Sequence, residues 1–113
     1  MKRYTKVNFS ELNPQDCCCG TTRRAFLDQD DAPASVHYLE VADEPKAHYH
    51  KQTTEIYLVL EGEGHLELDD EKVPVKPLSA VVIRPECRHR AIGELKVIVI
   101  PIPKHDDADF FFE

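Results

Sequence analysis

The sequence lacks any apolar run that approaches the length of a membrane-spanning helix, about 20 residues. Its basic start, Met1-Lys2-Arg3, leads into no apolar core of the kind that secretion signals carry. Basic runs are also missing, and the 113 residues carry a net charge of −7, which opposes binding to a phosphate backbone. We therefore expect a cytoplasmic protein that has neither a membrane nor a nucleic acid as its partner.

Helical periodicity and internal repeats are absent as well. Apolar and polar residues alternate instead over short segments that are separated by glycine, proline and aspartate, a pattern that predicts strands. A chain of this length forms one domain, and we expect an all-β sandwich or barrel. The expected strands are Val36–Val41, Ala47–His50, Glu55–Glu61, Gly64–Leu68, Lys72–Val75, Ala80–Arg84, His89–Ile92 and Lys96–Ile102, with a hairpin turn at Asp69-Asp70.

Composition divides the chain into three parts. Residues 1–33 are mixed and polar, and we interpret them as an N-terminal arm with a short edge strand that begins near Val7 and Phe9. Residues 34–103 carry the alternating pattern and should form the barrel. The tail, 104–113, joins an acidic run to three consecutive phenylalanines, which favour burial. We expect this tail to pack on its own barrel or on a partner chain.

Two histidines and a glutamate form the most informative pattern in the chain. His48 and His50 are two residues apart on an expected strand, so their side chains point to the same face. Glu55 follows at the head of an apolar strand and can turn onto that face. Imidazole nitrogens and a carboxylate oxygen are ligands of divalent transition metals. The pattern therefore predicts a metal site.

The spacing His-x-His-x4-Glu-x6-Gly, from His48 to Gly62, resembles the first motif of the cupin superfamily. The second cupin motif ends in a histidine after a proline turn, and the segment 81–89 fills this place. The resemblance covers roughly residues 34–103. It implies a double-stranded β-helix, the jelly-roll barrel of cupins, with short extensions at both ends. It also implies that His89 is a fourth metal ligand.

The chain departs from the cupin pattern at two turns. Cupins usually have glycine where Glu86 stands, and often have one near Leu78. Glycine eases tight turns, so the departures concern the geometry of the turn before His89. The chain is similar to small single-domain cupins that lie near the metal-binding barrel of mannose-6-phosphate isomerases. Small cupins are often dimers, which implies a homodimer here.

The expected ligand set binds one divalent transition metal ion per chain, and Fe, Mn, Ni, Zn, Co and Cu all suit it. Three histidines and one glutamate leave two neighbouring positions open on an octahedral ion. Structural metal sites are closed, so an open site favours a metal-dependent enzyme that acts on a small polar or anionic molecule. Such an ion could support an oxygenase, or act as a Lewis acid in a sugar-type isomerase. The alternative is a non-catalytic module that binds a small ligand.

Several residues could complete such a site. Tyr57 shares the inward face of Glu55, where it would act on a substrate proton or serve as a core aromatic. Arg24 or its neighbour Arg23 could bind a substrate carboxylate or phosphate, or could simply be a surface arginine. His37, Tyr57 and Glu86 are the candidates for a general acid or base.

Four cysteines remain, and we expect all of them to be reduced because no secretion signal precedes them. Cys17, Cys18 and Cys19 are consecutive, and the lack of Cys-x2-Cys spacing argues against a zinc site. Cys87 lies two residues before His89, where its thiol could influence a redox-active ion or simply fill a turn.

Overall fold

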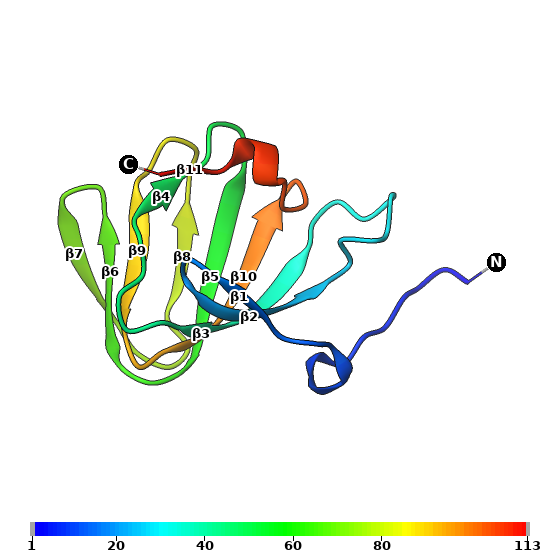
Figure 1. Cartoon of the computed structure of the whole chain (residues 1–113), viewed down its shortest axis with the longest axis horizontal. Coiled ribbons are helices and arrows are strands. Elements are labelled where there is room, and N and C mark those ends of the chain that lie inside the picture. The colour runs from blue at the N-terminus through cyan, green and yellow to red at the C-terminus, as the bar shows by residue number, and fades with distance from the viewer. Residues whose placement is uncertain (1, 113) are drawn as a thin grey trace.

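The computed structural model describes residues 2–112, which form two antiparallel β-sheets (Figure 1). The larger sheet has the strand order β1-β2-β3-β10-β5-β8, and the smaller has β11-β4-β9-β6-β7. The strands are β1 (Gln15–Cys17), β2 (Gly20–Ala25), β3 (Val36–Val41), β4 (His48–Tyr49), β5 (Thr54–Glu61), β6 (Gly64–Leu68), β7 (Glu71–Val75), β8 (Ala80–Ile83), β9 (His89–Gly93), β10 (Lys96–Ile102) and β11 (Phe111–Phe112). The strand pattern predicts this all-β architecture, and the cupin resemblance implies its jelly-roll barrel.

Helical structure in residues 2–112 is limited to two 3-10 turns, η1 (Phe9–Glu11) and η2 (Asp107–Asp109). No helix in this range has the length and apolar character needed to cross a membrane. The C-terminal tail runs across one end of the barrel beside β4, whereas the N-terminal segment extends away from the barrel (Figure 1).

The hydrophobic core lies between the two sheets and follows the period of two that the sequence shows. In β5 every second side chain is buried, and Val59 faces Leu66 and Val97 in one apolar cluster. Burial of one such side chain contributes about 1.5–3 kcal/mol to folding. The same alternation turns Glu55 and Tyr57 inward, so β5 carries apolar core residues at one end and functional candidates at the other.

The eight expected strands all form; three have the expected bounds, and the other five differ by one residue at one or both ends. The structure differs from the expectation at both ends of the chain: the tail adds the short strand β11, and the N-terminal arm has other elements than expected. Residues 15–25 form the hairpin β1–β2 on the edge of the larger sheet, and the expected strand near Val7 and Phe9 is replaced by η1. The pattern of β2 was hidden because its inward side chains include Thr22 and Arg24, which line a cavity and contact little of the apolar core. Its polarity therefore does not alternate like that of a core strand.

The tight turns of the barrel contain glycine at one position that requires it and other residues at two positions where cupins often have glycine. Asp69 and Asp70 form the hairpin turn between β6 and β7, as expected. Gly62 has φ +91°, and a Cβ there would lie 1.8 Å from the carbonyl oxygen of Glu94. Leu78 and Glu86, at the two positions where the resemblance expects glycine, have φ values of +73° and +75°. The turns thus keep the left-handed backbone conformation without the residue that adopts it most easily.

Candidate metal centre

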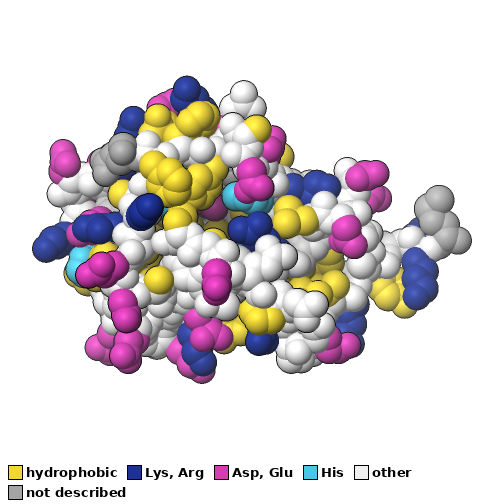
Figure 2. Space-filling view, in the orientation of Figure 1, with side chains coloured by type: hydrophobic (Ala, Val, Ile, Leu, Met, Phe, Trp, Pro, Cys, Tyr) yellow, Lys and Arg dark blue, Asp and Glu magenta, His cyan; other side chains and the backbone are white. Residues whose placement is uncertain are grey.

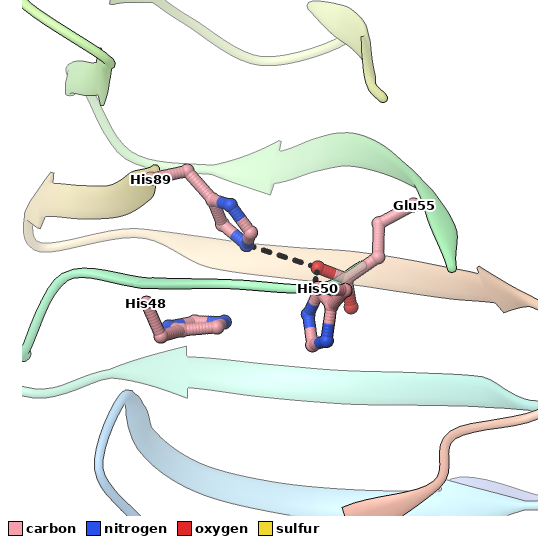
Figure 3. Close-up of side chains that lie close together, drawn as sticks. All are labelled: His48, His50, Glu55 and His89. Atoms are coloured by element: carbon pink, nitrogen blue, oxygen red, sulfur yellow. Dashed lines mark hydrogen bonds and ion pairs between the residues drawn. The ribbon is translucent and has the colours of Figure 1, made fainter. Parts of the chain in front are cut away.

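Four side chains with metal-binding groups converge at one end of the barrel (Figure 3). His48 stands on β4, His50 follows that strand, Glu55 stands on β5, and His89 opens β9 directly opposite His48. One ligand atom from each residue can be chosen so that all four lie within 4.8 Å of one another. All four residues are at least 95% buried. The four residues that the sequence and the resemblance single out could therefore hold a metal ion together.

Backbone carbonyl groups orient the three imidazoles. The Nδ1 atom of His50 lies 2.6 Å from the carbonyl oxygen of Asp109, and that of His89 lies 2.9 Å from the carbonyl oxygen of Cys87. A longer contact of 3.4 Å joins Nδ1 of His48 to the carbonyl oxygen of Lys46. An Nδ1–H that donates to a carbonyl directs Nε2 toward the cluster, where loss of the Nε2 proton would leave a lone pair for a metal. The arrangement fits the way in which metal-binding histidines are usually held.

The charges of the cluster also suit a divalent cation. Oε1 of Glu55 lies 3.1 Å from Nε2 of His50 and 3.0 Å from Nε2 of His89. Burial alone would raise the pKa of Glu55, but hydrogen bonds from these two imidazoles hold it well below its usual range. Burial and the neighbouring His89 lower the pKa of His48 to about 3. An ionised carboxylate beside a neutral imidazole is a donor set that binds first-row divalent metals.

The C-terminal tail fastens the segment that carries the ligands; the sequence led us to expect that the tail packs on a barrel, but not that it binds this segment. The carboxylate of Asp109 accepts hydrogen bonds from the backbone N–H groups of Lys51 (2.8 Å), Gln52 (3.0 Å) and Thr53 (3.0 Å), and from the Thr53 hydroxyl (3.0 Å). Phe110 stacks on the His48 imidazole, with ring centroids 4.4 Å apart. The tail therefore holds both ends of the segment between His48 and Thr53.

A cavity of about 250 Å³ adjoins the cluster, and its wall contains several of the expected functional residues. Tyr57 is 4% exposed, and its ring meets the His89 imidazole edge-on with centroids 6.0 Å apart. Arg24 lines the cavity, whereas the guanidinium of Arg23 donates to the carbonyl oxygen of Phe9. The Nε atom of Arg24 is buried and finds no acceptor among residues 2–112.

Of the two other candidates for proton transfer, one lies at the cavity and the other does not. His37 lines the cavity, and its Nε2 lies 2.9 Å from the Ser35 hydroxyl. Burial, and then the charge of Arg24, lower the pKa of His37 to about 4, so its imidazole is neutral at pH 7. Glu86 is exposed and lies outside the residues that line this cavity.

All four cysteines are free thiols. Cys17, Cys18 and Cys19 line the same cavity as the cluster, while Cys87 is half-buried and its thiol donates to the carbonyl oxygen of Arg88. Figure 2 shows hydrophobic side chains gathered over the region of β4 and β11, at the same end of the barrel as the cluster.

Comparison with known proteins finds one family match and many similar structures. A family model described as a cupin domain matches residues 35–112. The crystal structure of a protein from Planctomyces limnophilus is 34% identical, with a TM-score of 0.89 and coverage of 96% of both chains. A sequence relative, the uncharacterized protein MJ1618 from Methanocaldococcus jannaschii, is 36% identical over 66 residues, which are 55% of this chain. The match spans 53% of the length of that relative, about half of it.

Two enzymes share the fold at lower identity. Pac13 from Streptomyces, a nucleoside dehydratase, is 18% identical with a TM-score of 0.85, and the match covers 97% of this chain and 91% of Pac13. Ectoine synthase from P. lautus is 16% identical with a TM-score of 0.79, over 96% of this chain and 88% of the other. At these identities the similarity shows a common fold and does not extend to substrates.

Proposed function

This chain belongs to the cupin domain family, and we propose that it is an enzyme that uses one divalent metal ion to transform a small anionic molecule. The metal would be held by His48, His50, Glu55 and His89, whose buried donor atoms converge. The observation that carries the proposal is that the same cavity brings this cluster together with a guanidinium whose buried Nε atom has no acceptor, and with a neutral imidazole.

The guanidinium of Arg24 indicates the class of substrate. A buried N–H group without an acceptor is costly, and a bound ligand that supplies the acceptor removes this cost. Carboxylate and phosphate groups match the planar donors of arginine. A cavity of about 250 Å³ is smaller than the pockets that hold drug-sized molecules, so the substrate should be small. A small carboxylate or phosphate ester meets both conditions.

The cavity wall also offers groups for proton transfer. When bound, a divalent ion would supply Lewis-acid polarisation of a substrate oxygen. The neutral imidazole of His37 can accept a proton from substrate, because its low pKa keeps it unprotonated at neutral pH. Burial raises the pKa of Tyr57 well above its usual value, so its hydroxyl stays protonated and can donate a hydrogen bond. These residues favour proton-transfer chemistry of the sugar-isomerase type over the oxygenase alternative.

The fold-level comparison supports an enzyme in general terms. Pac13 is a nucleoside dehydratase, and its variants were solved with uridine, so a barrel of this shape can act on a small polar molecule. The low identity gives no reason to transfer its substrate to this chain. The main alternative remains a non-catalytic cupin that binds a small ligand. Proton-transfer groups beside the metal cluster favour the enzyme, because binding alone does not need them.

The experiment that tests the proposal follows proton exchange in D2O by NMR. Metal-loaded protein is incubated with a panel of small hydroxy carboxylates and phosphorylated polyols, while oxygen uptake is recorded in parallel. We expect metal-dependent deuterium incorporation or product formation, which the variant His37→Gln loses while it keeps its metal. Ligand binding without turnover would favour the non-catalytic module. Substrate-dependent oxygen uptake would favour an oxygenase.

A further inference from the structure

The three consecutive cysteines occupy the tip of the β1–β2 hairpin. Cys17 pairs with Gly20, and Cys18 and Cys19 form the two-residue turn between them. Consecutive side chains alternate between faces along a strand, but this alternation does not hold where the chain reverses at a turn. All three cysteines consequently line one cavity.

The hairpin tip places its thiols beside a metal-binding histidine. The Sγ atoms of Cys18 and Cys19 lie 3.5 Å apart, and Sγ of Cys19 lies 3.7 Å from Nδ1 of His48. One ligand atom from each of these three residues fits within 4.8 Å of the other two. Cys17 lines the same cavity but does not belong to this group of three.

These separations match a tetrahedral zinc site. With Zn–S bonds of about 2.3 Å and Zn–N bonds of about 2.0–2.1 Å, two sulfurs on one ion lie ~3.8 Å apart, and a sulfur and a nitrogen lie ~3.6 Å apart. The distances of 3.5 and 3.7 Å are each within about 0.3 Å of these values. Two of the three separations are thus already those of ligands on a single ion, and the third, between Cys18 and His48, is within 4.8 Å.

A disulfide between neighbouring residues explains the pair less well. Consecutive Cα atoms are about 3.8 Å apart across a trans peptide. Disulfides usually join Cα atoms that are about 4.4–6.8 Å apart. A bond between Cys18 and Cys19 would therefore be strained, whereas joint binding of a metal needs no approach closer than the observed distance.

We propose that the hairpin tip is a second metal site, in which the thiolates of Cys18 and Cys19 and Nδ1 of His48 bind a thiophilic ion such as Zn²⁺. Thiolate ligands select such ions, whereas the carboxylate-containing cluster accepts harder ones. His48 would serve both sites, with Nε2 directed to the first and Nδ1 to the second. Binding releases the thiol protons and the Nδ1 proton to solvent. The absence of Cys-x2-Cys spacing had argued against zinc, but the turn brings the ligands together without that spacing.

Cobalt titration tests this site directly, because thiolate-bound Co²⁺ gives a near-ultraviolet charge-transfer band that Co²⁺ bound by nitrogen and oxygen lacks. The full chain, freed of metal and kept reduced without air, should take up two ions and develop the band. The double variant Cys18→Ser/Cys19→Ser should lose the band and bind one ion fewer. Cys87→Ser is the matched control and should keep both. Absence of the band in the wild type, or its persistence in the double variant, would overturn the proposal.

A second measurement needs no variant and so does not depend on the folding of one. Alkylation of the thiols is followed by mass spectrometry with and without Zn²⁺, in protein whose first site is already filled with Mn²⁺. When Zn²⁺ is present at ten times its Kd, about one site in eleven is free, so alkylation of Cys18 and Cys19 should slow about tenfold. Alkylation of Cys87 should not change. Equal rates at Cys18 and Cys19 with and without Zn²⁺ would overturn the second site and leave the first site standing.

Discussion

Removal of the Asp109 side chain should loosen the metal centre from a distance. The variant Asp109→Ala loses four hydrogen bonds, three from the backbone of residues 51–53 and one from the Thr53 hydroxyl. Each would contribute about 0.5–1.5 kcal/mol, and partial exposure of the loop favours the low end. We expect a loss of about 2 kcal/mol in the free energy of unfolding. For a domain of this size, this lowers Tm by about 8 °C.

The same substitution should weaken metal binding, because the tail also orients His50. Asp109 carries both the carboxylate that is lost and the carbonyl oxygen that accepts a hydrogen bond from Nδ1 of His50. Loss of such an outer contact usually costs about 10–100-fold in metal affinity. Thermal unfolding and a Mn²⁺ titration measure the two effects. Asp107→Ala is the control: its carboxylate is 92% exposed and pairs with His105, so its loss should change stability by less than about 1 kcal/mol. Unchanged Tm and Mn²⁺ affinity in Asp109→Ala would refute this account of the tail.

Four further predictions concern the turn at Leu78, the role of Arg24, the pH dependence of the Asp109 contacts and the oligomeric state. Leu78→Gly should stabilise the fold by about 1 kcal/mol in chemical unfolding, because Leu78 is exposed and has φ +73°; equal or lower stability would mean that the turn carries no strain. Arg24→Ala should raise KM for an anionic substrate without loss of metal, and an unchanged KM would remove its anion-binding role. Burial alone would raise the pKa of Asp109, but its hydrogen bonds outweigh burial and hold this pKa below its usual value. The stability that Asp109 gives the fold should therefore persist above about pH 4 and fade as the pH drops further. A Tm difference between wild type and Asp109→Ala that does not shrink in acid would contradict this. Gel filtration should give the mass of a homodimer, which a single-chain mass would contradict.

Local alternation was enough to predict an all-β sandwich or barrel, and local spacing was enough to predict the core of the metal cluster. The alternation in β5 and β10 carries the apolar core, and a separation of two residues puts His48 and His50 on one face. The fourth ligand needed more, because His89 lies 34 residues beyond Glu55 and only the cupin resemblance connected the two. The structure brings His89 to the cluster through the pairing of β4 with β9, which sets it opposite His48.

The contacts that sequence reasoning missed join segments far apart in the chain. Asp109 is 59 residues from His50, and no spacing rule relates a tail carboxylate to a loop at that distance. The strand β2 was missed because Arg24 and Thr22 face a cavity, so its pattern lacks the apolar residues that identify a strand. The cysteine cluster was missed because the turn at Cys18 and Cys19 depends on a hairpin that was not expected.

The most direct test of the central claim is Mn²⁺ binding, followed by electron paramagnetic resonance, because Mn²⁺ favours oxygen and nitrogen over thiolate ligands. The wild type should bind one Mn²⁺ per chain. The variants His50→Ala and His89→Ala should bind none, while Cys18→Ser/Cys19→Ser should still bind one. Equal Mn²⁺ content in the wild type and in both histidine variants would show that these four residues do not hold the ion.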